Sequence, residues 1–460
     1  ASSSQGVLYA MESHYVTVGK KVGGFVLQVA ARVVSKHSLN VMAGHDDIYA
    51  LLASGYTILV GSNPQEAADL AAVSYRTSAL SLIPVANAMD GFSTSHMLSE
   101  ANLPEPELLR VYLGDPAGRI PCPTVAQEIL FGAKGRVFQL RGFLDRHRRD
   151  VLDSDVAALH AFLEARADDV EQDNAGDLVG LTLPWVPEEL HGAWRRQWVN
   201  AHTKGTRQLV PALVDIHNPG LTGPVQNQPD FQAGAVDHRT HFASAVPALV
   251  RQAMEEYAAL TGREYKPVLT YECDDADVIM VGLGSVGDDV RAVLPHLRVN
   301  GLKAGLASVK LLQPFPEAEL VEAVKGAKAV IVLERSDQTA LTQLVTAALF
   351  KARENAAGDP QRHPGIPPMT ETPRLTTAIF GLGGHDLQPR HLIAAFTQAD
   401  AGALPPLVYL GSQFFTEDPG SETLASLQER LRTAYPETQL MALETGANPR
   451  LLPEDALRIR

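Results

Sequence analysis

The stretch DVIMVGLGSVGDDV (277–290) joins an apolar run, a glycine-rich turn and the start of a helical pattern. Its first four residues, 277–280, predict a buried strand, and Gly282, Gly284 and Gly287 have the spacing of a dinucleotide-binding fingerprint. A strand that passes through a tight turn into a helix is the unit from which parallel α/β sheets are built. The stretch therefore predicts an α/β fold and raises the question of whether its turn binds a dinucleotide.

The same alternation continues around this stretch and defines a second α/β domain over 265–415. Apolar runs predict strands at 277–282, 303–312, 328–335, 376–381 and 406–411. Amphipathic patterns predict helices at 317–327 and 339–355, and a helix at 243–262 ends at Gly262 and leads into the domain.

A first domain over 1–250 shows the same rhythm. Strands are predicted at 24–34, 56–61 and 82–91, with helices at 46–55 and 63–80 between them. Asp46 is expected to cap the first of these helices, and Asn63, Pro64 and Glu66 form the N-cap, first-turn and capping-box pattern of the second. We therefore predict an α/β fold of two three-layer domains with mostly parallel sheets.

Residues of about 101–225 break this rhythm and predict an insertion of helices and proline-rich loops. We expect its tryptophans, Trp185, Trp194 and Trp198, to be packing anchors. The chain opens on ASSSQGVLYA without an initiator methionine, so we expect the first domain to be N-terminally incomplete. Residues 416–460 are predicted to connect to a following domain.

Composition excludes several kinds of partner. The formal charge of −14 on 460 residues repels phosphate backbones, and the basic run at 141–151 is expected to be a solvated helix face, so no nucleic-acid partner is predicted. Cys122 and Cys273 are too few to ligate an iron–sulfur cluster or a tetrahedral zinc ion. With no apolar run of transmembrane length and no signal-peptide pattern, we expect a cytoplasmic protein without a membrane partner.

The dinucleotide interpretation needs a carboxylate at the end of the next strand, to bind the ribose hydroxyls. The run 305–315 carries Lys310 and no Asp or Glu, so an NADP site, with Lys310 on a ribose phosphate, stays open. A second glycine-rich turn, GLGGHD (381–386), favours the alternative that both turns serve tight helix packing.

Four stretches, SSSQGVLYAM (2–11), VAARVVSKHSLNVMAGHDDIYALLASGY (29–56), DGFSTSH (90–96) and AALTGREYKPVLTYECDDADVIMVGLGSV (258–286), resemble the pyruvate:ferredoxin oxidoreductase family. These thiamine-diphosphate enzymes oxidatively decarboxylate 2-oxo acids with coenzyme A. The resemblance implies that the first domain carries the pyrimidine side of the thiamine site. It also implies that the second domain is similar to the C-terminal domain of transketolase and holds no nucleotide.

Arg32 falls where the family keeps an arginine that reaches the 2-oxo acid, so the resemblance implies a substrate-binding role. A planar guanidinium suits a carboxylate, and the end of a parallel strand is where open α/β sheets bind ligands. The alternative is a surface ion pair. In 90–96 the chain has Ser93 where the family commonly has arginine, which leaves His96 without an assigned role.

The resemblance further implies that Ser4, Gln5 and Gly6 form a turn close to the thiamine cofactor. A plain turn is the alternative. His45 and Asp47 match a family His-x-Asp and are expected near the site, although paired acids at a helix start commonly cap the helix. No catalytic residue and no metal ligand is assigned in this chain.

The implied function is a segment or subunit of a 2-oxoacid:ferredoxin oxidoreductase that is inactive alone, with pyruvate as the first expected substrate and 2-oxoglutarate as the second. Thiamine diphosphate and Mg²⁺ are expected to be held mainly by other domains or chains, with coenzyme A and 4Fe-4S clusters elsewhere in the complex. The expected partners are those domains or subunits and ferredoxin or flavodoxin, in an oligomer. The family's activating glutamate lies upstream of the Ser-Gln-Gly turn, so two alternatives stay open: a non-catalytic assembly module, and an NADP-linked oxidoreductase built on 277–312.

Overall fold

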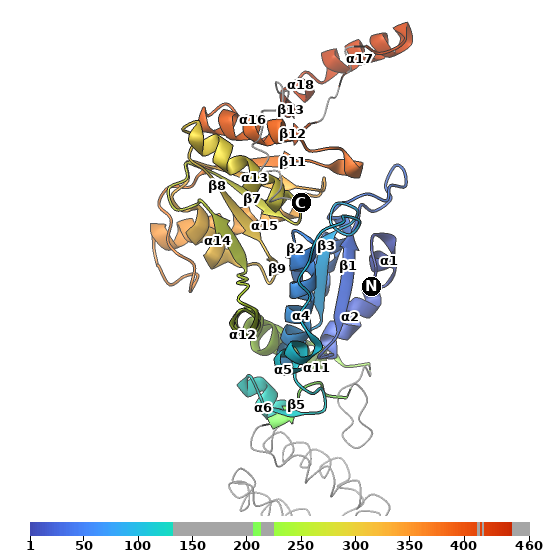
Figure 1. Ribbon diagram of the computed structural model, residues 1–460, viewed down its shortest axis with the longest axis vertical. Coiled ribbons are helices and arrows are strands. Elements are labelled where there is room, and N and C mark those ends of the chain that lie inside the picture. Colours follow the sequence, from blue (N-terminus) through green and yellow to red (C-terminus); the bar gives the residue numbers. More distant parts are fainter. Residues whose placement is uncertain (132–205, 213–224, 412–414, 416–417, 444–460) are drawn as a thin grey trace, which may run out of the picture.

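The computed structural model describes residues 1–131, 206–212, 225–411, 415 and 418–443. The tryptophans, the basic run at 141–151 and most of the expected insertion lie outside these residues. Within them the chain forms two α/β domains, each with a mostly parallel mixed sheet, as the sequence predicts (Figure 1).

The first sheet has the strand order β1-β3-β2-β9. Its strands are β1 (Val26–Ala31), β2 (Thr57–Gly61), β3 (Val85–Asp90) and β9 (Leu311–Gln313). The first three are parallel, and β9 runs antiparallel to β2. Because parallel strands end at the same edge of a sheet, the residues that follow β1, β2 and β3 meet at one edge.

Helices cover both faces of this sheet. They are α1 (Gln5–Tyr9), α2 (Met11–Gly19), α3 (Asp46–Leu51), α4 (Pro64–Ser81) and α12 (Val246–Thr261). Ile58 and Val60 point from β2 into a hydrophobic cluster with α1, α2 and α3, whereas Leu59 between them packs with α4 and α12. The two faces of one strand thus serve two cores, which is why β2 is apolar throughout.

The start of α4 follows its sequence pattern with one difference. The Asn63 side chain accepts a hydrogen bond from the N–H of Glu66, as the N-cap prediction requires. The Glu66 carboxylate, however, accepts from the N–H of Ser62 at 2.7 Å, one residue before the position that a capping box uses. That shift leaves the carboxylate able to reach Lys310 of the second domain.

The second sheet has the order β13-β12-β11-β10-β7-β8-β6. Its strands are β6 (Val268–Tyr271), β7 (Val278–Leu283), β8 (Ala304–Val309), β10 (Ala329–Glu334), β11 (Arg374–Ile379), β12 (Leu407–Leu410) and β13 (Ala442–Leu443). All neighbours are parallel except β6 and β8. Its helices are α13 (Val286–Val299), α14 (Glu317–Val324), α15 (Ala340–Ala357) and α16 (Pro389–Asp400).

One strand prediction is wrong in an informative way. The apolar run 303–312 is not a single strand, because it divides at Lys310 into β8 of the second sheet and β9 of the first. Two antiparallel pairings, Ile58 with Gln313 and Leu59 with Leu311, attach β9 to β2. A segment that follows the second domain's strand therefore completes the first domain's sheet, and the two domains share a strand-to-strand connection.

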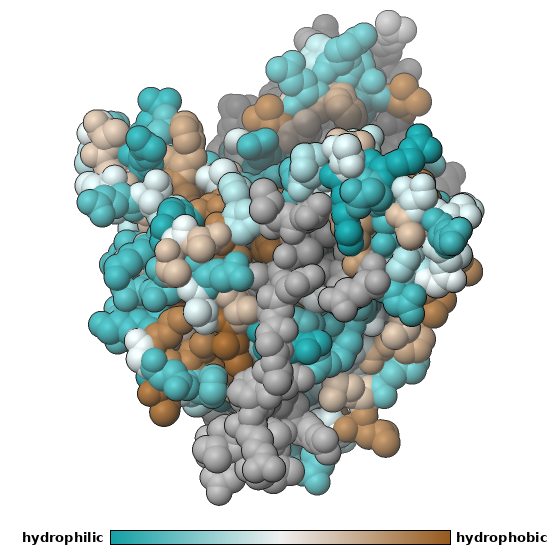
Figure 2. All heavy atoms as spheres, turned by 90° about the horizontal axis from the view of Figure 1, so that it is seen from above, coloured by the Kyte–Doolittle hydropathy of each residue, from teal (hydrophilic) through white to brown (hydrophobic). Residues whose placement is uncertain are grey.

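Smaller elements lie at both ends of the molecule in Figure 1. They are α5 (Pro106–Leu113), β4 (Arg119–Pro121), α6 (Val125–Phe131), β5 (Thr206–Gln208), α11 (Gln228–Asp237), α17 (Glu422–Ala434) and α18 (Thr438–Met441). Seen from above, the described surface has separate hydrophobic groups among hydrophilic ones (Figure 2). None of the described helices combines the length and the apolar character that a membrane crossing requires.

Candidate functional site

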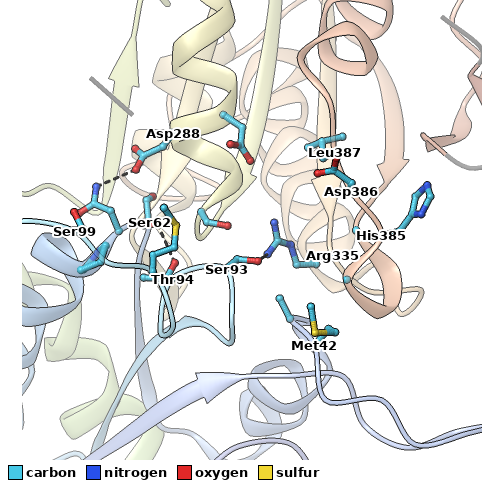
Figure 3. Close-up of a pocket in the computed structure, with 18 of the residues that line it drawn as sticks. Met42, Ser62, Ser93, Thr94, Ser99, Asp288, Arg335, His385, Asp386 and Leu387 are labelled. Atoms are coloured by element: carbon cyan, nitrogen blue, oxygen red, sulfur yellow. Dashed lines mark hydrogen bonds between the residues drawn. The ribbon is translucent and has the colours of Figure 1, made fainter. Parts of the chain in front are cut away.

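The strand ends of the two sheets face each other across a cavity of about 430 Å³. The residues after β2 and β3 line it from the first domain, and those after β7, β10 and β11 line it from the second. Figure 3 shows Ser93 and Arg335 side by side in this cavity, with Asp288 farther along the wall. Burial raises the pKa of Asp289 in the same wall to about 6, although the charge of Arg335 opposes that rise.

The glycine turn at the edge of this cavity holds a carboxylate of the protein itself. Gly284 has a φ of +75°, and a Cβ atom there would lie 2.6 Å from Oδ2 of Asp90. The N–H of Ser285 donates to the same oxygen at 2.7 Å. The turn therefore accommodates Asp90 of the first domain at the place where a dinucleotide fingerprint would hold a pyrophosphate.

Lys310 is likewise occupied by partners within the protein. Its side chain is 1% exposed, and its Nζ lies 2.6 Å from Oε2 of Glu66 and 2.5 Å from Oγ of Ser62. A buried ammonium that is paired with a carboxylate is not available for a ribose phosphate. The geometry of this turn and of Lys310 supports the packing interpretation of the glycine pattern.

Asp90 is the centre of a buried polar cluster between the domains. Its Oδ1 lies 2.8 Å from Nε2 of His45, and its Oδ2 lies 3.2 Å from Nη1 of Arg335. Burial disfavours the charged carboxylate, but the charges of Arg335 and His45 hold the pKa of Asp90 well below its ordinary value. Because Arg335 follows β10 and Asp90 ends β3, this cluster fixes the edge of one sheet against the edge of the other.

Arg32 directly follows β1 at this edge of the first sheet. Its backbone N–H donates to Asp47, and its guanidinium lies over the ring of Phe92, 5.0 Å from the ring centroid. Nε of Arg32 is buried and has no hydrogen-bond partner among the described residues. No carboxylate of those residues pairs with this guanidinium either, so the expected alternative of a surface ion pair has no support in this part of the chain.

The predicted Ser4-Gln5-Gly6 turn is the first turn of helix α1, with Ser4 at the N-cap position, and it lies against the same strand end. The N–H of Ser4 donates to Oδ2 of Asp47 at 2.6 Å, and the Ser4 hydroxyl donates to the carbonyl of Val33 at 2.6 Å. The Gln5 side chain donates to Ser35. Asp47 thus holds the turn and Arg32 through one carboxylate oxygen, and the residues predicted from distant parts of the sequence come together.

The simpler interpretation, that Asp46 and Asp47 cap a helix, is wrong. His45 occupies the N-cap position of α3 without a side-chain cap hydrogen bond. Asp46 accepts from the Val34 N–H at 3.1 Å and from the Ser336 hydroxyl at 2.7 Å. Both carboxylates reach across to other segments because α3 begins beside the end of β1, where unpaired backbone N–H groups need acceptors.

Burial raises the pKa of Asp47 to about 6, and the backbone hydrogen bonds from Ser4, Arg32 and Ile48 oppose this rise. Its side chain has no exposed surface. Three donors on one buried carboxyl stabilise its charged form, but they do not fully offset the loss of water.

Three residues of this region were missed by the sequence reasoning: Asp90, Phe92 and Arg335. A signal was present for two of them, because Asp90 and Arg335 each stand at the carboxyl end of a run predicted to be a strand. Phe92 lies in the stretch 90–96 that carries part of the resemblance, but nothing in that stretch indicated its φ of +59°, which is unusual for a residue with a Cβ atom. Among the described residues, no group of three or more His, Cys, Asp and Glu side chains is arranged to hold a metal ion.

A two-domain α/β protein, with polar residues gathered where parallel strands end, is the class that this fold and site define. Comparison with known families makes the class specific. Residues 1–120 match the family described as "Pyruvate flavodoxin/ferredoxin oxidoreductase, thiamine diP-bdg", and residues 276–358 match "Pyruvate:ferredoxin oxidoreductase core domain II". Two regions of this chain are thus matched by domains of the pyruvate/2-oxoacid:ferredoxin oxidoreductase family: residues 1–120 by its thiamine-diphosphate-binding domain, and residues 276–358 by its core domain II.

Individual relatives are distant. The chain is 25% identical over 396 residues to a pyruvate-flavodoxin oxidoreductase of Klebsiella pneumoniae, covering 86% of this chain and 25% of that one. It is 30% identical over 195 residues to the pyruvate synthase subunit PorA of Thermotoga maritima, covering 42% of this chain and 45% of that subunit. A solved 2-oxoglutarate:ferredoxin oxidoreductase from Magnetococcus marinus matches with a TM-score of 0.44 and 14% identity, over 86% of this chain and 52% of that one. The chain thus spans about a quarter of the length of the pyruvate-flavodoxin oxidoreductases that it matches.

Proposed function

We propose that this chain is part of a 2-oxoacid:ferredoxin oxidoreductase, in which Arg32 binds the carboxylate of the 2-oxo acid. Pyruvate is the first expected substrate and 2-oxoglutarate the second. The observation that carries the proposal is the Arg32 guanidinium, which lies at a parallel strand end without a carboxylate partner among the described residues. An unpaired, partly buried guanidinium favours an anion from outside the chain.

The described residues fit one side of a thiamine site. The backbone N–H groups of Ser4 and Arg32 both donate to the carboxylate of Asp47. A cofactor at the Ser4-Gln5-Gly6 turn would therefore be close to a substrate at Arg32. Thiamine diphosphate, when bound, supplies a ring that takes up the electron pair released by decarboxylation. Its Mg²⁺ and the coenzyme A and 4Fe-4S clusters of the reaction are proposed to be held mainly by other domains or subunits.

The residues of this chain bind and orient the substrate. A guanidinium presents two parallel N–H donors to a carboxylate, which fixes the direction in which the 2-oxo carbon points. Stacking on Phe92 limits the orientations of the Arg32 side chain before the substrate arrives. Asp47 holds the backbone on both sides of this arrangement, so its role is to position the arginine and the turn.

The proposed overall reaction is balanced. The 2-oxo acid loses CO₂, its acyl group forms a thioester with coenzyme A as the thiol loses a proton, and two electrons pass through the clusters to ferredoxin or flavodoxin. Because the chain carries two of the family's domains, we propose that it works in an assembly with the remaining domains or subunits.

The test is anaerobic viologen reduction by the natively purified assembly that contains this chain, with thiamine diphosphate, Mg²⁺ and coenzyme A. Pyruvate and 2-oxoglutarate are offered separately. Coenzyme-A-dependent reduction with either acid is the expected result and identifies the substrate. A preparation with intact clusters and bound thiamine that reduces no viologen with either acid contradicts the proposal and favours the assembly-module alternative.

Arg32→Lys in that assembly tests the assigned residue. Charge-assisted hydrogen bonds contribute about 1.5–3 kcal/mol, and about 1.4 kcal/mol is a factor of ten, so KM for the 2-oxo acid should rise about 10- to 100-fold. Lysine keeps the charge but lacks the planar pair of donors. Arg110→Lys is the matched control, because Arg110 pairs with Glu107 on the exposed surface of α5. An unchanged KM in Arg32→Lys would remove Arg32 from the substrate site.

A further inference from the structure

Arg335 belongs to the second domain but makes its polar contacts with the first. Its Nη1 lies 3.2 Å from Oδ2 of Asp90. The same atom donates to the Ser93 hydroxyl at 3.0 Å (Figure 3). Its backbone carbonyl accepts the His45 N–H at 3.0 Å. The residue is 6% exposed, and its guanidinium packs over the ring of Phe380 at 4.9 Å. Arg335 is therefore held in one orientation, with its charged end on the segment 90–96.

This segment, which we call the Asp90 loop, is a compact turn. The carbonyl of Asp90 accepts from the N–H groups of Thr94 and Ser95 at 3.0 and 3.1 Å. The Ser95 hydroxyl accepts the N–H of Phe92 at 3.0 Å, and Phe92 has a φ of +59°. A residue with a Cβ atom adopts that conformation only where its surroundings impose it. The loop's internal hydrogen bonds and the contact of Arg335 with Ser93 together hold the backbone on both sides of Phe92.

On its other side the Asp90 loop touches Arg32. The Phe92 ring lies under the guanidinium at 5.0 Å, and the N–H of Gly91 donates to the carbonyl of Ala31, next to Arg32, at 2.8 Å. A Cβ atom on Gly91 would lie 2.7 Å from Cγ of Arg32, so the loop backbone is in direct contact with that side chain. One seven-residue loop therefore separates Arg335 from Arg32.

We infer that Arg335 is a positioning residue for the substrate-binding arginine, and that it acts through Ser93 and Phe92 of the Asp90 loop. This inference rests on the proposed function. It gives the second domain a role in substrate binding, because Arg335 of that domain holds the Asp90 loop in place, and Arg32 stacks on Phe92 of the same loop. Losing the Arg335 contact should let Phe92 and Arg32 adopt several orientations, which weakens binding of the 2-oxo acid and leaves the later steps largely intact.

The experiment uses the holoenzyme assembly with Arg335→Lys and, separately, Ser93→Ala. Arg335→Lys keeps a charge beside Asp90 but loses the planar guanidinium that reaches Ser93. Ser93→Ala removes only the acceptor on the loop. We expect KM for the 2-oxo acid to rise roughly tenfold in Arg335→Lys and about threefold in Ser93→Ala, with kcat nearly unchanged, because small displacements of a binding group cost this much. Arg251→Lys is the matched control, since Arg251 pairs with Glu319 of the other domain away from this loop.

A double variant distinguishes positioning from general destabilisation. If Ser93 acts through Arg32, Ser93→Ala should have no further effect on KM in an Arg32→Lys background. An unchanged KM in both single variants, or fully additive effects in the double variant, would overturn the inference.

Failure of the proposed function is recognised separately, as absence of 2-oxo-acid activity in the unaltered assembly. In that case hydrogen exchange of the peptides that span Arg32 and Gly91 decides the structural coupling. Faster exchange in Arg335→Lys than in Arg251→Lys supports the coupling between the Asp90 loop and the end of β1, and equal exchange rejects it.

Discussion

At the scale of single residues, Asp47 shows how one buried carboxyl organises the candidate site. It receives the N–H groups of Ser4, Arg32 and Ile48, which come from three separate segments around the end of β1. Burial nevertheless raises its pKa from 3.8 to about 6. The folded protein therefore binds a proton at Asp47 more tightly than the unfolded chain does, and its stability must depend on pH in a definite direction.

We expect Asp47 to contribute most to stability below pH 4, and this contribution to be lost as pH rises through about 6. One pKa unit corresponds to about 1.4 kcal/mol, so the contribution of Asp47 to the free energy of unfolding should fall by at most about 3 kcal/mol over this range. Urea unfolding between pH 4 and 7, followed by hydrogen exchange of peptides that span Asp47, measures the change.

Asp47→Asn should reduce this dependence, because the amide does not titrate, and Asp289, whose pKa burial also raises to about 6, should account for part of the slope that remains. Asp274→Asn, at an exposed carboxylate, is the control and should leave the dependence in place. An unchanged slope in Asp47→Asn would show that Asp47 does not contribute to the titration.

At the scale of an element, the strand–turn–helix unit from β7 to α13 joins the two domains through a glycine. Gly284 combines a left-handed φ of +75° with a close approach to the Asp90 carboxylate. Either feature alone disfavours a side chain, and the second ties this turn to the first domain. The glycine spacing that resembles a dinucleotide fingerprint thus serves an interface between protein groups.

Gly284→Ala should destabilise the protein by about 2–3 kcal/mol, the sum of a strained φ and a displaced carboxylate. Gly301→Ala is the matched control, because Gly301 has a φ of +86°, but apart from its chain neighbours none of the described residues comes within 4 Å of the place a Cβ atom would occupy. The control should cost about 1 kcal/mol, the conformational part alone. Thermal unfolding of both variants provides the comparison, and equal losses would show that Asp90 moves aside freely.

At the scale of the whole molecule, the two domains form one structural unit. A single hydrophobic cluster includes Val29 and Ile58 of the first sheet together with Val281 and Val332 of the second. Strand β9 belongs to the first sheet, and the Asp90–Arg335 and Lys310–Glu66 pairs lie buried between the domains. Neither domain could separate without exposing apolar surface and uncompensated charges.

We therefore expect both domains to unfold in one step. Peptides that span 57–61 and 278–283 should lose hydrogen-exchange protection at the same urea concentration. Lys310→Met should lower that concentration for both, because breaking a buried pair costs about 3–5 kcal/mol. Lys325→Met is the control, since Lys325 pairs with Glu322 on the exposed surface. Separate transitions for the two peptides would show that the domains are independent.

The local patterns of the sequence determined the class of fold. Alternating apolar runs and capped helical segments predicted α/β domains with mostly parallel sheets, because period and capping are local properties that each segment carries by itself. The same locality placed Arg32 at a strand end, whereas the Ser4-Gln5-Gly6 turn and Asp47 became candidates only through the family resemblance.

Tertiary structure alone decided what those residues contact. Lys310 divides an apolar run between two sheets, Asp90 binds the N–H of Ser285 in a glycine turn 195 residues away in sequence, and Arg335 reaches the loop that supports Arg32. These outcomes depend on which strand edges meet. A sequence pattern predicts that a residue is buried, but the packing of whole sheets determines which group pairs with a buried charge. Such a charge must find a partner because burying an unpaired charge costs too much free energy.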